Sequence, residues 1–178
     1  VILQLTDVHI GGGAFSAGKD RSAMEAVAQL VYESKPDLVI ITGDIAYPVP
    51  FQSGSFNNLN PTKEFAALME SLGVYWTVVF GNHDTEAYSY YNREEISKFY
   101  YNAEINFAHN DKAHCLFQSG PADVDGYGNY IINVKNTQGI VTQSLVLLDS
   151  HSYTDGDYLG IRWAYDNIHQ NQIDWYSR

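Results

Sequence analysis

The chain has 178 residues, of which 45% are hydrophobic and 14% aromatic, so it can bury a sizeable core and we expect a single domain over residues 1–178. A formal net charge of -11 argues against a broad nucleic-acid-binding surface, which needs clustered lysine and arginine. The lone Cys115 excludes an internal disulfide and a multi-cysteine metal site and leaves the compartment undecided. Because no apolar run approaches the roughly 20 residues that cross a bilayer, we expect a soluble protein without a membrane partner.

The first 80 residues alternate between predicted strands and helices. Apolar, β-branched runs predict strands, and apolar residues repeating at helical spacing predict the two helices between them. The strands are expected at 1–5, 37–42 and 74–80; the first helix is expected to be capped by Asp20 or Ser22 and to end at Pro36, and the second to begin at Asn60–Pro61 and to end at Gly73. This order predicts a parallel sheet with crossover helices.

The second half of the chain carries less regular signals. We expect helices at 92–101 and 166–178 and strands at 114–118, 127–135 and 144–149. Asp123, Asp125 and Gly126 resemble part of a calcium loop, but a hairpin turn is the better interpretation. The chain opens inside a predicted strand and stops at Arg178 within or just after an amphipathic stretch, so we expect that it lacks parts of the natural domain.

Each of the first three predicted strands ends in polar, chemically capable residues. The first is followed by Asp7-Val8-His9, the second by Gly43-Asp44, and the third by Gly81-Asn82-His83-Asp84. Because parallel strands bring their carboxyl ends to one edge of the sheet, we expect these side chains to share one crevice. Turn chemistry after a strand is the competing explanation for each aspartate or asparagine taken alone.

The residue types in this crevice suit a two-metal centre. Oxygen and imidazole ligands fit Mn²⁺, iron or Zn²⁺ without a thiolate. Two dications about 4 Å apart repel each other by roughly 16 kcal/mol at an effective dielectric of 20, so a carboxylate between them is needed, and Asp44 is the natural bridge. Asp7 and His9 would hold one ion, and Asn82 would supply a neutral oxygen to the other.

The blocks D-x-H, G-D and G-N-H-D, in that order, resemble the signature of the calcineurin-like metallophosphoesterases. The segments "LDSHSY" and "IHQNQIDWY" resemble the branch related to purple acid phosphatases. The resemblance implies an α/β fold, an α-β-β-α sandwich of two mixed sheets flanked by helices, with its C-terminal part missing. It implies that His83 and Asp84 are catalytic, with Asp84 orienting His83, and that the metal ligands are Asp7, His9, Asp44 and Asn82.

The activity implied is metal-dependent hydrolysis of a phosphoester, most simply a monoester, by in-line attack of a metal-bound hydroxide. A phosphorylated small molecule or protein would be the substrate, and bound metal ions would offset the acidic surface that opposes such an anion. A phosphodiesterase or nucleotidase is one alternative. A non-catalytic scaffold of the same fold is another, which the intact His83 disfavours.

One block of the family signature is absent, since no Gly-His pair occurs in the chain. The remaining histidines lack the expected sequence context: His109, His114, His151 and His169. We therefore expect further metal ligands outside this chain, and we expect the chain to bind at most one metal tightly and to be nearly inactive. Tyr47 follows Asp44 at the spacing of an iron-binding tyrosine, but the presence of His9 favours a packing or pocket-wall role.

Overall fold

A computed structural model describes residues 1–101, 113–154 and 164–178. Three short strands form a parallel sheet in the order β1-β2-β3, with β1 at Ile2–Leu5, β2 at Leu38–Ile41 and β3 at Tyr75–Val78. The register pairs Leu5 with Ile41 and Ile41 with Val78, so all three strands end level with one another. The predicted parallel sheet is confirmed, and its carboxyl edge is a single row.

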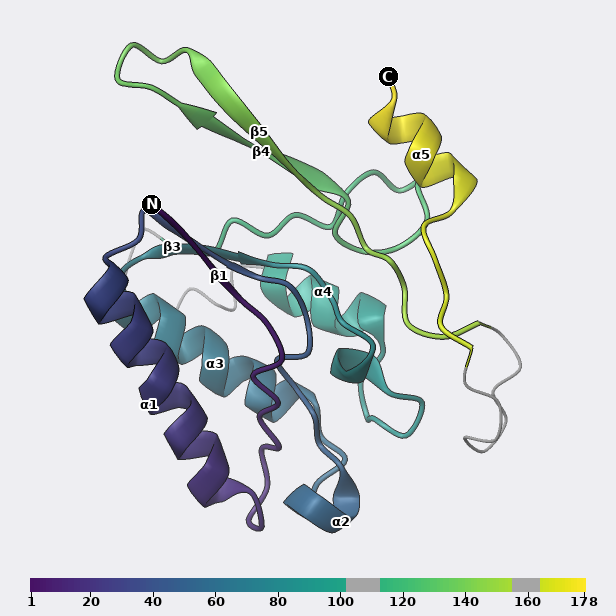
Figure 1. Ribbon diagram of the computed structural model, residues 1–178. Helices are drawn as coiled ribbons and strands as arrows, with labels where there is room; N and C mark the ends of the chain where they lie inside the picture. Colours follow the sequence, from purple (N-terminus) through teal and green to yellow (C-terminus); the bar gives the residue numbers. More distant parts are fainter. Residues whose placement is uncertain (102–112, 155–163) are drawn as a thin grey trace.

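Two crossover helices connect these strands, α1 at Ala17–Ser34 and α3 at Leu59–Leu72. Figure 1 shows them side by side against the sheet. The core between the helices and the sheet is made of fully or almost fully buried apolar side chains, among them Val27, Val39, Ile41, Phe65, Met69 and Trp76. This burial explains why the apolar residues of both helices recur every three or four positions.

The first helix begins earlier than the sequence suggested, because Ser16 rather than Asp20 or Ser22 stands at its N-cap. The Asp20 carboxylate instead accepts hydrogen bonds from the backbone N–H groups of Gly11 and Gly12, at 2.9 and 3.0 Å, and from the Ser16 hydroxyl at 2.7 Å. Asp20 is buried. The carboxylate therefore fixes the glycine-rich loop that follows the first strand.

A second, antiparallel sheet consists of β4 at Tyr130–Lys135 and β5 at Val141–Leu147. The strand expected at 114–118 does not form, since only an isolated bridge joins Cys115 to Trp76. Backbone bonds from Trp76 to His114 and from Leu116 to Trp76 nevertheless hold this segment beside β3. It is too short and irregular to count as a strand.

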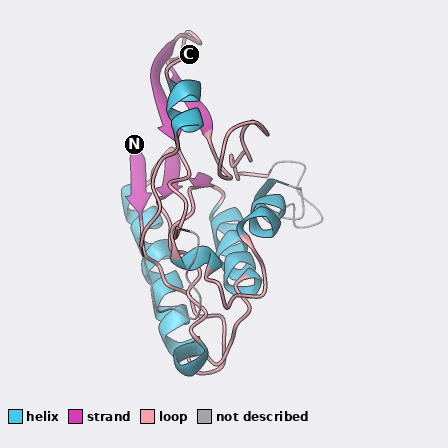
Figure 2. Ribbon diagram, turned by 90° about the vertical axis from the view of Figure 1, so that its right-hand side faces the viewer, coloured by secondary structure: helices cyan, strands magenta, loops and turns pink. Residues whose placement is uncertain are grey.

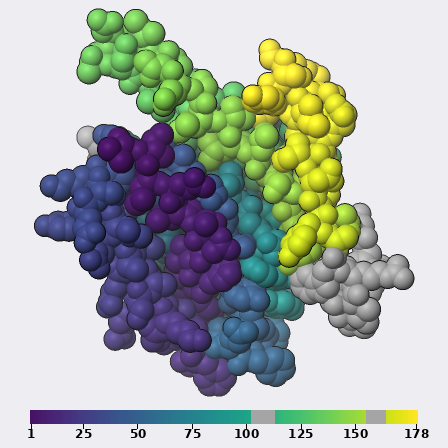
Figure 3. All heavy atoms as spheres, viewed as in Figure 1, coloured from purple at the N-terminus to yellow at the C-terminus, as the bar shows by residue number. Residues whose placement is uncertain are grey.

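The remaining helices are α2 at Pro50–Ser53, α4 at Arg93–Tyr101 and α5 at Gln170–Tyr176, with a 3-10 turn η1 at His83–Thr85. The final helix is therefore shorter than the predicted 166–178. The β4–β5 hairpin and α5 lie at the opposite end of the molecule from the first turn of α1 (Figures 1 and 2). In the space-filling view they form two separate projections (Figure 3).

The predicted α/β organisation with two sheets is confirmed. Within the described ranges each sheet holds strands of one relative direction, parallel in the first and antiparallel in the second. Of the helices in those ranges, none has the length and apolarity needed to span a membrane. The assignment of residues 1–178 to one domain stays a prediction.

Candidate metal centre

The carboxyl edge of the parallel sheet carries the predicted ligands. Strand-like pairing continues past the strand ends, because Asp7 donates its N–H to Gly43 and His9 donates to Asp44, at 3.1 and 3.0 Å. The loops after β1 and β2 therefore leave the sheet together. This pairing brings Asp7, His9 and Asp44 to one place.

The backbone at these three residues is strained. Asp7, His9 and Asp44 have φ values of 56°, 54° and 57°, in the left-handed region that non-glycine residues rarely adopt. Only two other non-glycine residues in the described parts of the chain, Lys35 and His151, share this feature. Strain of this kind costs of order 1–3 kcal/mol per residue and concentrates at functional sites.

Two glycines allow the loops after β2 and β3 to approach each other. A Cβ atom on Gly43, where φ is +104°, would lie 2.6 Å from the Gly81 nitrogen. A Cβ on Gly81 would lie 2.1 Å from the Asp44 carboxylate. A side chain at Gly81 would displace the Asp44 carboxylate, and one at Gly43 would push the two loops apart.

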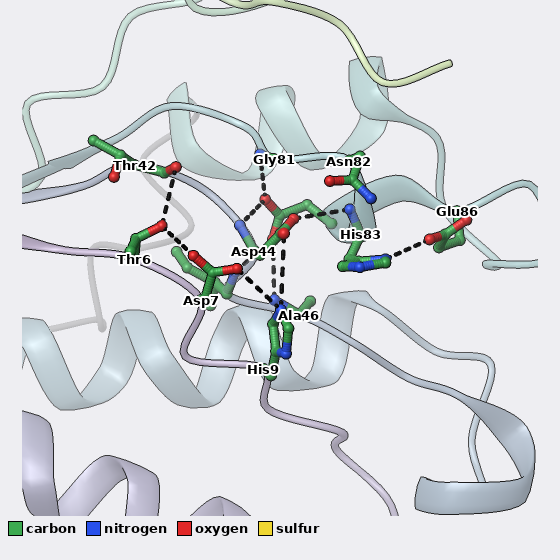
Figure 4. Close-up of polar contacts among 12 residues, drawn as sticks. Thr6, Asp7, His9, Thr42, Asp44, Ala46, Gly81, Asn82, His83 and Glu86 are labelled. Atoms are coloured by element: carbon green, nitrogen blue, oxygen red, sulfur yellow. Dashed lines mark hydrogen bonds and ion pairs between the residues drawn. The ribbon is translucent and has the colours of Figure 1, made fainter. Parts of the chain in front are cut away.

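Asp44 is the central acceptor of the cluster (Figure 4). Its Oδ2 lies 3.7 Å from His9 Nε2, and its Oδ1 accepts the backbone N–H of His83 at 2.8 Å. His9 Nε2 lies 3.5 Å from Asp7 Oδ1. One donor atom from each of His9, Asp44 and His83 falls within 4.8 Å of the others, close enough for an ion to be held among them.

Asn82 also faces this cluster. Its amide nitrogen donates to the Tyr153 hydroxyl at 2.7 Å, which leaves the amide oxygen as the atom free to coordinate a cation. Figure 4 shows this oxygen on the side nearer Asp44. The orientation agrees with the neutral oxygen ligand that the sequence predicts.

The ring of His83 is fixed by Glu86, since Nδ1 lies 2.6 Å from Glu86 Oε1. Glu86 is almost fully buried, and the same oxygen accepts the Tyr153 hydroxyl at 3.1 Å. The carboxylate favours the tautomer with a proton on Nδ1, which leaves Nε2 as the nitrogen that can contact a metal or a substrate. Tyr47 packs against the rings of His9 and His83, at centroid distances of 4.9 and 4.2 Å, as a pocket-wall residue would.

Asp84 does not contact the His83 ring, which we expected it to orient. Its carboxylate accepts hydrogen bonds from backbone amides, and Glu86 is the residue whose carboxylate contacts the His83 ring. Asp84 Oδ1 accepts the N–H groups of Ile45 and Ala46, and Oδ2 those of Asp44 and Gly81, all at 2.8–3.0 Å. Burial raises the pKa of the Asp84 carboxyl, and the amides oppose this shift. Asp84 thus ties the loop after β2 to the loop after β3.

The donor set fits one metal ion and part of the ligand shell of a second. Carboxylate oxygens, imidazole nitrogens and an amide oxygen suit Mn²⁺, iron or Zn²⁺, and the absence of a side chain at Gly81 leaves room for the Asp44 carboxylate. Asp7, His9 and Asp44 would hold one ion, with Asp44 and Asn82 contributing to the other. His83 lies close enough to serve either as a ligand or as an acid toward the substrate.

The other described histidines lie elsewhere. His114 contacts Glu70 at 3.0 Å, and His151 stacks on His169 with a centroid distance of 4.1 Å. His109 lies outside the described residues.

Sequence reasoning missed Arg93. Its guanidinium donates to the fully buried Asp149 at 2.8 Å and to the Gly81 carbonyl at 3.0 Å. Arg93 therefore links the third strand end to the segment after β5. The asparagine and acidic residues around it in 92–95 read as an ordinary helix start and carried no signal of this contact.

A parallel sheet with this set of side chains at its carboxyl edge defines an α/β protein with a candidate metal site. The chain belongs to the calcineurin-like phosphoesterase family, whose family model matches residues 1–176. Family members generally have a dinuclear metal centre.

Three relatives in Arabidopsis thaliana are named as purple acid phosphatases. The chain is similar to "Probable inactive purple acid phosphatase 14", at 29% identity over 99% of the chain, and to "Probable inactive purple acid phosphatase 29" and "Probable inactive purple acid phosphatase 28", at 24% over 99% and 25% over 98%. The chain spans 45–46% of the length of these relatives.

Proposed function

We propose that this chain carries the metal-binding half of a phosphomonoester hydrolase that uses two metal ions. The observation that carries the proposal is the convergence of His9, Asp44 and His83, which come from three separate strand ends and place donor atoms within 4.8 Å of one another. Turn chemistry alone would not require the three histidine and aspartate side chains to meet. The family membership supports a phosphoester substrate.

The ions, when bound, would polarise the phosphoryl group and lower the pKa of a coordinated water. The protein's own residues do the rest. Glu86 orients the His83 ring through Nδ1 and would stabilise its protonated form, which could donate the Nε2 proton to the departing alcohol. Asp84 keeps the Asp44 and Gly81 loops together, so that the ligands are placed before substrate arrives. Preorganisation of this kind lowers the cost of reaching the transition state.

The substrate we propose is a phosphorylated small molecule or protein. An acidic chain would repel such an anion, but two bound dications reverse the field locally. A non-catalytic metal-binding domain is the second candidate, because the relatives carry the word "inactive" in their names. The His83–Glu86 pair fits both candidates, because a carboxylate orients a metal-binding imidazole as well as a catalytic one, so measured turnover decides between them.

The test is hydrolysis of p-nitrophenyl phosphate in Mn²⁺, measured on this chain and on the full protein encoded by its gene. Both proteins are measured because the chain covers less than half of the length of its relatives. We expect turnover in the full protein and a drop of about 10²–10⁴-fold in kcat for His83→Asn, with metal content unchanged.

The matched control is His114→Asn, which removes a histidine that lies against Glu70, away from the cluster. The control should keep full activity. Equal loss in both variants would remove His83 as the acid. No turnover in any protein with both metals bound would favour the non-catalytic domain. Faster turnover of bis-p-nitrophenyl phosphate than of the monoester would show that the protein is a phosphodiesterase and not the proposed monoesterase.

A further inference from the structure

A second cluster of histidine and aspartate side chains lies outside the site described above. It consists of Asp125, His151, Asp166 and His169, which come from three separate segments of the chain. One donor atom from each of His151, Asp166 and His169 lies within 4.8 Å of the others. None of these residues belongs to the family signature blocks at the ends of β1, β2 and β3.

The nitrogen that His151 can offer is determined by Gln172. The oxygen of the buried Gln172 amide accepts the backbone N–H of His169 at 2.8 Å, and its nitrogen donates to Asn129 Oδ1 and to the Asp149 carbonyl. The amide orientation is therefore fixed. Since His151 Nε2 lies 3.0 Å from that same oxygen, it must carry a proton, and the neutral ring has its lone pair on Nδ1.

His169 is flanked by two carboxylates. Its Nδ1 lies 2.8 Å from Asp125 Oδ2, and its Nε2 lies 3.3 Å from Asp166 Oδ1. A carboxylate on one ring nitrogen is the usual way in which proteins orient a histidine whose other nitrogen binds a metal. Asp125 is placed to play that part, and His169 Nε2 lies beside the Asp166 carboxylate.

We propose that His151 Nδ1, His169 Nε2 and the Asp166 carboxylate form a second, separate binding site for Zn²⁺. Gln172 and Asp125 orient the two imidazoles from behind. Two histidines and one carboxylate are a common three-residue zinc set, which leaves the fourth position to water or to a ligand. The site stands independently of the proposed phosphoesterase activity.

The spacing of the donors is close to what the ion needs. Zinc bonds of about 2.0–2.1 Å in tetrahedral geometry place neighbouring ligand atoms about 3.3 Å apart. The Asp166 and His169 atoms already stand at 3.3 Å. One donor atom of each of the three residues lies within 4.8 Å of the others. Because the His151 and His169 rings are stacked with planes 20° apart, the rings must turn about their side-chain bonds before one nitrogen of each can face a common ion.

The backbone around the cluster is already arranged to hold these residues together. Asp166 donates its N–H to the Ser152 carbonyl at 3.2 Å, and Thr154 donates to Ala164 at 2.9 Å. These bonds tie the segment that carries His151 to the one that carries Asp166. His151 itself has a left-handed backbone, with a φ of 65°, the conformation that Asp7, His9 and Asp44 also adopt.

The experiment is a Zn²⁺ titration of this chain followed by NMR of the histidine imidazoles. We expect the His151 and His169 signals to shift together to saturation, with nitrogen shifts that report coordination through Nδ1 of His151 and Nε2 of His169. Signals of His9 and His83 report the first site separately. Unshifted His151 and His169 signals at millimolar Zn²⁺ would overturn the proposal.

Variants provide a second readout by calorimetry, in a His9→Ala background that disables the first site. His151→Ala should weaken Zn²⁺ binding at least about 100-fold, and Asp125→Asn, which alters only the orienting carboxylate, about 10–100-fold. His114→Ala is the control and should leave the affinity unchanged. Wild-type affinity in both the His151 and the Asp125 variants would also overturn the proposal, whether or not zinc binds elsewhere.

Discussion

Glu86 holds His83 through a contact of 2.6 Å between Oε1 and the imidazole Nδ1. The two residues lie three positions apart across the 3-10 turn at His83–Thr85. Tyr153 reaches the same carboxylate oxygen at 3.1 Å and also accepts the Asn82 amide. A candidate acid, its orienting carboxylate and a candidate metal ligand are therefore joined by one chain of hydrogen bonds.

Replacing Glu86 by glutamine should lower kcat at least tenfold, and at most by the about 10²–10⁴-fold that a whole general acid contributes. Glutamine can still accept the Nδ1 proton but lacks the charge that stabilises a protonated ring. KM and Mn²⁺ affinity should stay within about twofold, and Glu86→Ala should be worse. Glu94→Gln, at an exposed residue that pairs with Lys98, is the control. Loss of metal in step with loss of kcat would show that Glu86 only supports the loop.

Asp84→Asn should destabilise the protein by at least about 2 kcal/mol. Each carboxylate oxygen of Asp84 accepts two backbone N–H groups. Whichever oxygen becomes an NH₂ group, two buried amide donors will face a donor, and such unsatisfied groups cost about 1–3 kcal/mol each. Urea unfolding measures the change, with the exposed Asp123→Asn as a control expected within about 0.5 kcal/mol. Equal stability of the two variants would show that the Asp84 hydrogen bonds do not hold the loops after β2 and β3 together.

Cys115 should be almost unreactive in the folded protein. Burial raises the pKa of its thiol to about 12, so at pH 8 the reactive thiolate is about a thousandfold scarcer than in the unfolded chain. An aromatic disulfide reagent should label Cys115 slowly in buffer and rapidly in urea. Because the folded thiol keeps its proton where the unfolded one loses it, stability should fall as pH rises between about 9 and about 12. Comparable labelling rates in both states would contradict the prediction.

The sequence predicted the sheet and the meeting of its strand ends because both follow from local rules. Short, β-branched apolar runs such as 37–42, set between helical patterns, predict strands. The carboxyl ends of parallel strands lie at one edge of the sheet. Asp7, Asp44 and Asn82 directly follow those strands, so their positions needed no tertiary information. Gly43 and Gly81, which also follow predicted strands, indicated the same edge of the sheet.

The contacts that orient the site could not be predicted in this way. Asp84 bonds to amides about 40 positions earlier in the chain, and no spacing in the sequence announces that pairing. The contact between Glu86 and His83 could have been predicted, because a carboxylate three residues after a histidine is a local pattern. The G-N-H-D block instead led to the prediction that Asp84 orients His83. Asp125 and His169 lie 44 positions apart. Taken alone, Asp125 reads as a turn residue and His169 as part of the predicted final helix.

Paramagnetic broadening by Mn²⁺ of the histidine signals of this chain, in a His151→Ala background, tests the central claim most directly. The account predicts that sub-stoichiometric Mn²⁺ broadens His9 and His83 before His114, because His9 Nε2 lies 3.7 Å from Asp44 Oδ2 in the cluster that would hold the ion. Asp44→Asn, which keeps the shape but removes the charge, should abolish this preference. Unchanged broadening of His9 and His83 in Asp44→Asn, or sharp signals from both in the parent protein at millimolar Mn²⁺, would contradict a metal centre at the end of this sheet.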